Sequence, residues 1–205
     1  MELYTAGTGN GQRAAIAVNE CGVACKIHVL NLAQGDQKKP DYLKINPTGR
    51  IPTLIDPQGP DGKPLTLIQS WAILIYLAEK TGKLRAHNTV ARARTFQWVA
   101  EGASDMAPAA QNIFFLGSRM PEKVPDSAVK FYEDRLVNLF RAAEQQLSES
   151  PYLTGDEVTI ADIGIYPIYA GRKALIDGAG LKNVTAWGER VGSRPAVQKG
   201  MKLES

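Results

Sequence analysis

Two short segments of this 205-residue chain carry groups that suit a small peptide ligand. In the first, Pro52 follows Ile51 at the entry to an apolar run, which leaves Ile51 without a normal ladder partner. The N–H and C=O of Ile51 are then free to pair with an extended peptide, and a cis Ile51-Pro52 bond would fix the bend. In the second, Gln69 and Ser70 open a helix, whose free N–H groups and dipole favour a carboxylate. Together the two segments predict a binding site for a small peptide.

A glycine-rich loop, Gly7-Thr8-Gly9-Asn10-Gly11, follows the first predicted strand. A dinucleotide-binding loop of the form G-x-G-x-x-G would need glycine at position 12, where Gln12 stands, and the Lys-Ser/Thr pair of a phosphate loop is missing. We therefore do not interpret the loop as a nucleotide site. Thr8 and Asn10 either cap the helix that follows or present hydrogen-bond donors to a ligand.

The cysteines and histidines do not form a recognisable reactive cluster. Cys21 and Cys25 are spaced C-x3-C instead of C-x-x-C, and we expect both to be small buried apolar residues. His28 and His87 are the only histidines, and neither has ligand-type residues around it in the sequence. We expect no metal site and no histidine catalysis.

The composition is that of an ordinary globular protein, with 44% hydrophobic residues and a net charge of +3. No block of lysine and arginine stands out, so no nucleic-acid partner is expected. No apolar stretch approaches the roughly 20 residues of a membrane span, and the N-terminus lacks a signal-peptide pattern. We expect a cytoplasmic protein that has no membrane association.

The order of predicted elements indicates an α+β half followed by an all-helical half. We expect domain 1–82, a polar linker at 83–89 and a helical domain at 90–205. Strands are predicted at 2–5, 26–32, 52–56 and 65–68, helices at 12–21 and 70–80, and a short helical or irregular segment at 36–45. Later helices are predicted at 90–116, 126–147, 160–171, 183–192 and 196–203.

Two local features of the second half concern folding more than chemistry. Thr159 and Asp162 have the spacing of a capping box, in which each side chain satisfies the backbone N–H of the other at a helix start. The large apolar residues of the long helices are expected to lie mostly in the core, with lining of a hydrophobic co-substrate site as the alternative. These residues are Trp98, Phe114, Phe115 and Met120.

Taken together, the β-α-β-β-α half with Ile51-Pro52 and Gln69-Ser70, and the helical half with Thr159-Ile160-Ala161-Asp162, resemble the cytosolic glutathione S-transferases. The resemblance covers nearly the whole chain. It implies an N-terminal thioredoxin-like domain followed by an all-α domain. It also implies that Ile51, held by Pro52, pairs its backbone with the cysteinyl part of glutathione, and that Gln69 and Ser70 bind the γ-glutamyl group.

The loop Leu3-Tyr4-Thr5-Ala6-Gly7-Thr8-Gly9-Asn10-Gly11, with Gly35-Asp36-Gln37 further on, is similar to the Nu-class and yeast prion-like (Ure2-like) branch of that family. This implies that Thr8 and Asn10 face the glutathione sulfur and that Gln37 borders the glycyl carboxylate. The chain has glycine at positions 7 and 9 where the family tends to have proline. It has Gln69 where many relatives have glutamate, so a carboxylate such as Asp105 of a neighbouring subunit is expected to face the glutamyl ammonium.

The resemblance implies a glutathione-dependent enzyme that exchanges thiols with glutathione disulfides, with possible transfer of glutathione to an electrophile. Glutathione would be the co-substrate, no metal is implied, and a homodimer is expected from the apolar faces of the long helices. A non-catalytic glutathione-binding or regulatory module on the same fold is the alternative.

Overall fold

The computed structural model describes residues 1–203, and packing divides the chain into two compact units. The first unit contains Met1–Arg85 together with the C-terminal segment that begins at Ser193, and the second contains Ala86–Gly192. These units differ from the expected ranges 1–82 and 90–205, because the last helix packs with the first unit. The division into sequence-continuous domains with a linker at 83–89 stays a prediction.

A mixed four-stranded sheet forms the centre of the first unit. Its strands are β1 (Glu2–Thr5), β2 (Lys26–Val29), β3 (Thr53–Asp56) and β4 (Leu65–Ile68), in the order β2-β1-β3-β4. β1 is parallel to β2 and antiparallel to β3, and β3 is antiparallel to β4. The parallel pair requires a crossover connection, which α1 (Gly9–Cys21) supplies. Leu3 and Leu54 lie opposite each other on β1 and β3, and neither is exposed.

The crossover helix α1 is buried along most of its length because elements from both ends of the chain cover it. It packs against β1, α3 (Ser70–Thr81) and α10 (Pro195–Met201). Gly200 of α10 approaches Ile16 so closely that a Cβ at position 200 would lie 2.6 Å from the backbone nitrogen of Ile16. The short elements of this unit are η1 (Asp36–Lys38), α2 (Pro40–Ile45) and η2 (Pro60–Gly62).

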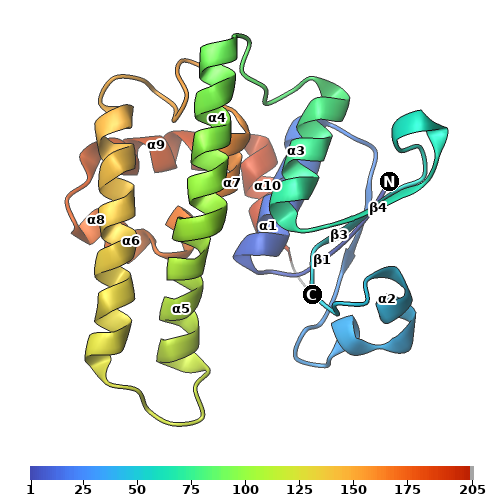
Figure 1. Cartoon of the computed structure of the whole chain (residues 1–205), viewed down its shortest axis with the longest axis horizontal. Helices are drawn as coiled ribbons and strands as arrows, with labels where there is room; N and C mark the ends of the chain where they lie inside the picture. The colour runs from blue at the N-terminus through green and yellow to red at the C-terminus, as the bar shows by residue number, and fades with distance from the viewer. Residues whose placement is uncertain (204–205) are drawn as a thin grey trace. The chain divides into compact units, whose positions relative to one another are not determined.

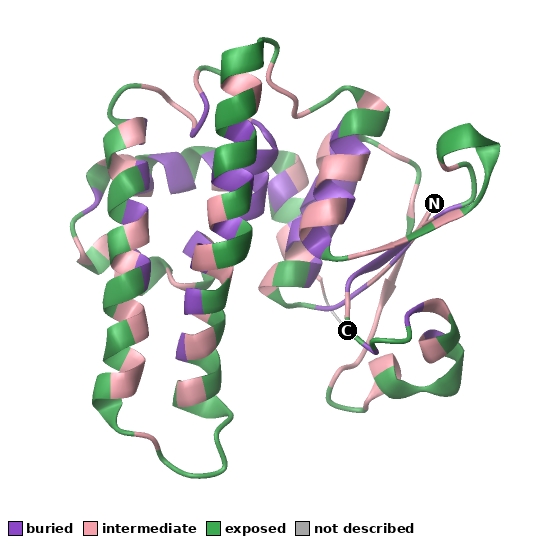
Figure 2. Ribbon diagram, viewed as in Figure 1, coloured by how far each residue is buried: buried purple, intermediate pink, exposed green. Residues whose placement is uncertain are grey.

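The described residues of the second unit form helices and no strand beyond an isolated bridge between Tyr152 and Gly155. Figure 1 shows one long rod, in which α4 runs into α5, and the long helix α6 beside it. A π-helical segment joins the two halves of the rod, and Figure 2 shows that buried residues are sparse along α6. The helices are α4 (Thr89–Glu101), η3 (Gly102–Met106, π), α5 (Ala107–Ser118), α6 (Asp126–Leu147), α7 (Ile160–Gly171), α8 (Lys173–Gly178) and α9 (Lys182–Gly192).

The expected capping box is present at the start of α7. Asp162 Oδ2 accepts from the backbone N–H of Thr159 at 2.9 Å. Asp162 Oδ1 accepts from the backbone N–H of Leu153 at 2.9 Å and from Trp187 Nε1 at 2.8 Å. One buried carboxylate therefore connects the loop before α7, α7 itself and α9.

Four expectations about local structure need correction. β2 ends at Val29, before the predicted strand end at residue 32. α1 begins at Gly9, earlier than the predicted start at residue 12, because Thr8 caps the helix. The short helix α8 was not predicted. Phe114, Phe115 and Met120 are 42%, 43% and 49% exposed, so they are not core residues, whereas Trp98 is 5% exposed and is one.

Candidate functional site

A small pocket in the first unit brings together five of the seven residues that the sequence predicts for binding. The start of α1, the turn before β3, the end of β4 and the start of α3 all contribute to it. The predicted residues Thr8 and Gln37 are not among its lining. The lining residues are Asn10, Asn46, Thr48, Arg50, Ile51, Pro52, Ile68, Gln69 and Ser70.

The turn that carries Ile51 is held by buried polar side chains. The hydroxyl of Tyr42 and the amide of Asn46 both donate to the Arg50 carbonyl, at 2.6 and 2.7 Å. The Asn46 amide also donates to Thr53 Oγ1 at 3.0 Å, at the start of β3. The Ile51-Pro52 peptide bond is cis, and Ile51 itself makes no backbone hydrogen bond to the residues that the structure describes. The backbone of Ile51 is thus fixed in place with its polar groups available to a ligand.

The start of α3 provides the second wall of the pocket. Gln69 precedes the helix with φ +74°, a left-handed conformation that residues other than glycine rarely adopt. Such backbone strain typically persists where function requires a particular orientation. Ile73 donates the first helical hydrogen bond, to the Gln69 carbonyl at 3.0 Å, so the N–H groups of residues 70–72 lie ahead of the helical ladder. Ser70, which is buried, places its hydroxyl at this positive end.

Arg13 contacts two residues that line the pocket, and it was not among the residues that the sequence predicts for the site. It is only 1% exposed, and its Nη1 lies 2.6 Å from Asn10 Oδ1 and 2.9 Å from Ser70 Oγ. Its guanidinium carbon lies 4.3 Å from the centre of the Trp71 ring. Burial lowers the pKa of Arg13 to about 9, so the side chain stays charged at neutral pH. In the sequence Arg13 is one polar residue in an alanine-rich helix, three residues after Asn10, and no local pattern distinguishes it as a site residue.

Thr8 and Gln37 have other local roles in the structure. Thr8 is the N-cap of α1, and its hydroxyl oxygen accepts from the backbone N–H of Gly11 at 3.3 Å. The capping alternative raised for Thr8 is therefore realised, and Thr8 is exposed beside Asn10. Gln37 lies in η1, where its amide nitrogen donates to the Leu32 carbonyl at 3.4 Å. The buried oxygen of Gln37 has no partner among the described residues.

The cysteines lie outside this pocket. Cys21 is buried and Cys25 is only partly buried, so the expectation that both are buried holds for Cys21 alone. Burial raises the pKa of both thiols, which disfavours the reactive thiolate form. Residues 1–203 contain no group of three His, Cys, Asp or Glu side chains that could hold a metal ion, and no helix long and apolar enough to cross a membrane.

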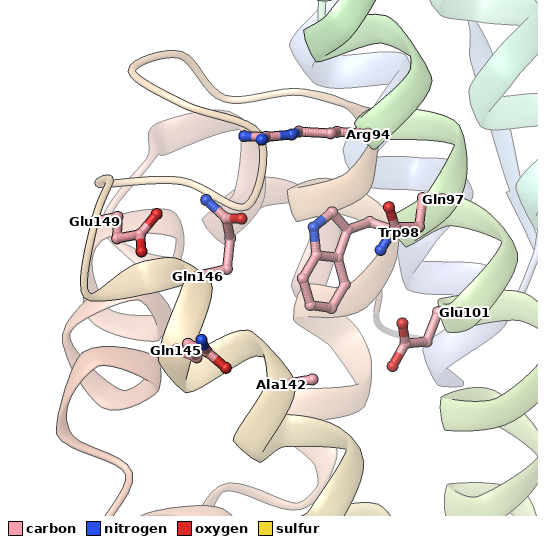
Figure 3. A pocket seen from close by; sticks show the side chains of 8 residues that line it. All are labelled: Arg94, Gln97, Trp98, Glu101, Ala142, Gln145, Gln146 and Glu149. Atoms are coloured by element: carbon pink, nitrogen blue, oxygen red, sulfur yellow. The ribbon is translucent and has the colours of Figure 1, made fainter.

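A larger cavity, of about 360 Å³, lies between α4 and α6 in the second unit. Figure 3 shows the indole of Trp98 facing side chains that α6 contributes. Burial raises the pKa of the Glu101 carboxyl here, and the nearby Asp105 raises it further. None of the seven residues predicted to bind glutathione lies in this cavity, and long polar side chains line most of it. Trp98, for which lining of a hydrophobic co-substrate site was the alternative, does line it. The lining residues are Arg94, Gln97, Trp98, Glu101, Ala142, Gln145, Gln146 and Glu149.

Comparisons with known proteins agree over both halves of the chain. The family model "Glutathione S-transferase, N-terminal domain" matches residues 10–80, and "Glutathione S-transferase, C-terminal domain" matches residues 106–202. The disulfide-bond oxidoreductase YfcG of Escherichia coli (strain K12) is 34% identical over 199 residues, which covers 96% of this chain and 92% of YfcG.

Two solved structures are also similar. A glutathione transferase from Burkholderia graminis, crystallised with two glutathione molecules bound per subunit, has a TM-score of 0.90 and 31% identity. The match covers 98% of this chain and 86% of that one. The glutathione transferase URE2P6 from Phanerochaete chrysosporium, in complex with oxidised glutathione, has a TM-score of 0.86 and 31% identity, over 97% of this chain and 93% of that one.

Proposed function

Because the chain belongs to the glutathione S-transferase family, we propose that it is a glutathione-dependent enzyme that reduces disulfide bonds. The family and its disulfide-bond oxidoreductase branch are those that the sequence resembled, and the thioredoxin-like and all-helical fold is confirmed. The observation that carries the proposal is the pocket of the first unit. It combines an available peptide backbone at Ile51 with hydrogen-bond donors at Asn10 and Ser70.

Glutathione is a peptide with carboxylates at both ends and a thiol between them. In the proposed complex, the γ-glutamyl carboxylate lies at the start of α3, where Ser70 and the free N–H groups donate to it. Ile51 pairs its backbone with the cysteinyl residue beside Pro52, which directs the sulfur toward Thr8 and Asn10. Gln69 bonds the glutamyl group without contributing a charge, and Gln37 borders the glycyl carboxylate.

The proposed reaction is thiol–disulfide exchange between two glutathione molecules and a disulfide. A bound glutathione thiolate attacks one sulfur of the disulfide, which forms a mixed disulfide and releases the other sulfur as a thiolate that takes up a proton. A second glutathione thiolate then attacks the glutathione sulfur of the mixed disulfide. Glutathione disulfide forms and the second substrate thiol leaves, so the substrate gains two electrons and the two glutathiones lose them.

The role of the protein in this reaction is to make the thiolate available. A free thiol has a pKa of about 8.5, so most glutathione is protonated at neutral pH. Hydrogen-bond donors at Asn10 and the positive end of α1 lower the pKa of a thiol that lies beside them. The same donors stabilise sulfur as it accumulates charge in the transition state.

A homodimer and a cytoplasmic location are further parts of this proposal. Val90 on α4 and Phe131 on α6 are 66% and 61% exposed, and large exposed apolar side chains are typical of surfaces that associate. In the dimer, Asp105 of a neighbouring subunit faces the glutamyl ammonium. Within one chain Asp105 already bonds Arg135 at 3.1 Å. A cytoplasmic location fits a co-substrate that maintains the reducing poise of that compartment.

The test is turnover of hydroxyethyl disulfide by the purified protein with reduced glutathione, beside calorimetric binding of glutathione. We expect both. Binding without turnover of the disulfide or of an electrophile would favour the alternative, a glutathione-binding module without catalysis. No binding would reject the proposed function.

A further inference from the structure

The buried guanidinium of Arg13 decides which atoms of Asn10 face the pocket. Arginine has only donors, so the Asn10 side-chain atom 2.6 Å from Arg13 Nη1 must be the carbonyl oxygen. Ser70 Oγ lies 3.4 Å from the same oxygen. The amide nitrogen of Asn10 consequently points away from Arg13, and it has no hydrogen-bond partner among the described residues. Asn10 therefore offers two N–H donors to the pocket that it lines.

Arg13 constrains the hydroxyl of Ser70 by the same logic. Nη1 donates to Ser70 Oγ at 2.9 Å, so that oxygen already acts as an acceptor. The hydroxyl hydrogen must then point elsewhere, and its acceptor among the described residues is Asn10 Oδ1, at a long 3.4 Å. A ligand carboxylate would offer this hydrogen a shorter and stronger bond. Ser70 thus also acts as a donor to a ligand.

We propose that Arg13 is a positioning residue that turns both Asn10 and Ser70 into donors, so that the pocket selects a ligand with acceptor atoms at two points. The inference rests on the proposed function, in which those points are the thiolate and the γ-glutamyl carboxylate of glutathione. The Nη1 nitrogen of Arg13 carries two hydrogens, and it donates one to Asn10 and one to Ser70. Arg13 touches no reacting atom, and it acts through the two side chains that it orients.

The location of Arg13 gives this arrangement its rigidity. Arg13 is on α1 and Ser70 begins α3, so the contact between them joins two helices through residues that are 57 positions apart in the chain. The contact with Asn10 lies within α1 and fixes the Asn10 side chain on that helix. Trp71 lies against the guanidinium and limits its rotation. A neutral or flexible side chain at position 13 would leave the Asn10 amide free to turn its oxygen toward the ligand.

The test compares Arg13→Met, Arg13→Lys and Asn10→Asp with wild type. Glutathione affinity is measured by calorimetry, and kcat/KM for hydroxyethyl disulfide is measured across pH. For Arg13→Met we expect the affinity for glutathione to fall roughly tenfold or more. We also expect the rise of kcat/KM with pH to occur at higher pH, because the bound thiol loses oriented donors. Arg13→Lys, which keeps a charged donor, is expected to recover part of both.

Asn10→Asp keeps an oxygen for Arg13 while removing the N–H donors, so it tests donor orientation even if the Arg13 variants fold poorly. We expect it to remain folded and to move the rising limb to higher pH as well. Arg194→Met is the matched control, because Arg194 bonds Glu20 of α1 at 2.6 and 2.7 Å and does not line the pocket. It is expected to keep the wild-type profile.

The outcomes separate the two claims. A wild-type protein that neither binds glutathione nor turns over the disulfide rejects the proposed function, and the inference with it. An active wild type whose Asn10→Asp variant keeps its affinity and pH profile rejects the inference alone. A folded Arg13→Met variant with wild-type behaviour does so too.

Discussion

Arg13 in the first unit and Asp162 in the second are both buried ionisable side chains, but their hydrogen-bond partners belong to different kinds of structure. Asp162 accepts hydrogen bonds from Leu153, Thr159 and Trp187, which belong to the elements that the carboxylate connects. Arg13 donates to Asn10 and Ser70, which line a pocket. The hydrogen-bond partners of a buried ionisable group therefore indicate, better than its burial does, whether the group stabilises the fold or belongs to a ligand pocket.

The largest effect that this comparison predicts is on stability in the second unit. Asp162→Ala leaves the N–H groups of Leu153, Thr159 and Trp187 buried without their acceptor. Each such loss costs ~1–3 kcal/mol, so we expect the free energy of unfolding to fall by about 3 kcal/mol or more. Chemical denaturation measures this. Asp134→Ala, which removes an exposed carboxylate from α6, is the control, and its effect is expected within about 0.5 kcal/mol.

The second prediction concerns the pocket of the first unit, where the main expected loss is in ligand binding and not in stability. Ser70→Ala is expected to weaken glutathione binding by ~1.5–3 kcal/mol, because it removes one hydrogen bond to a charged group. Stability is expected to fall by less than in Asp162→Ala, because only one buried donor among the described residues, on Arg13, loses its acceptor. Calorimetry on the variant and wild type gives the answer. Equal affinities would exclude Ser70 from the binding site and would leave Asn10 as the one pocket residue through which Arg13 is proposed to act.

Asp56 is a third buried ionisable side chain, and its contribution to the stability of the first unit depends on pH. Burial raises the pKa of Asp56, but hydrogen bonds from Lys80, Tyr76 and the Gln58 backbone outweigh it and hold the pKa below its usual range. In the unfolded chain the pKa of an aspartate is about 3.9. The stabilisation by ionised Asp56 is therefore complete above that pH, and it disappears as the pH falls through the lower pKa of Asp56 in the folded protein. Asp56→Asn should cost ~1 kcal/mol at neutral pH and flatten the loss of stability in acid. The free energy of unfolding is measured by urea denaturation at a series of acidic pH values. If the variant loses stability in acid as steeply as the wild type, this role of Asp56 is contradicted.

Features that depend on neighbouring residues were predictable from the sequence. The capping box needs only Thr159 and Asp162 three residues apart, and α6 spans the predicted 126–147 because its apolar residues recur with a helical period over that range. Ile51, Gln69 and Ser70, which line the pocket, were also predicted from local patterns. A proline entering a strand and a polar residue opening a helix are local patterns, and the resemblance to a family supplied their meaning.

Features that depend on distant packing were not predictable. From the sequence, Arg13 is one polar residue on a helix, and only the folded structure shows that Ser70 lies beside it. Phe114 and Phe115 were expected in the core because they are large and apolar, yet the sequence cannot say whether a neighbour covers them, and they are exposed. Likewise, nothing local shows that α10 joins the unit formed by the first part of the chain.

The central claim is that the reacting thiol belongs to bound glutathione and not to the protein. The direct test compares two double variants, each checked for folding by circular dichroism, in the hydroxyethyl disulfide assay with glutathione. Cys21→Ala/Cys25→Ala should retain activity, because neither cysteine lines the pocket and burial raises the pKa of both thiols. Thr8→Ala/Asn10→Ala should lose most of it, because the sulfur loses its donors. An inactive cysteine variant beside an active Thr8/Asn10 variant would place the chemistry on the protein's own thiols and contradict the account.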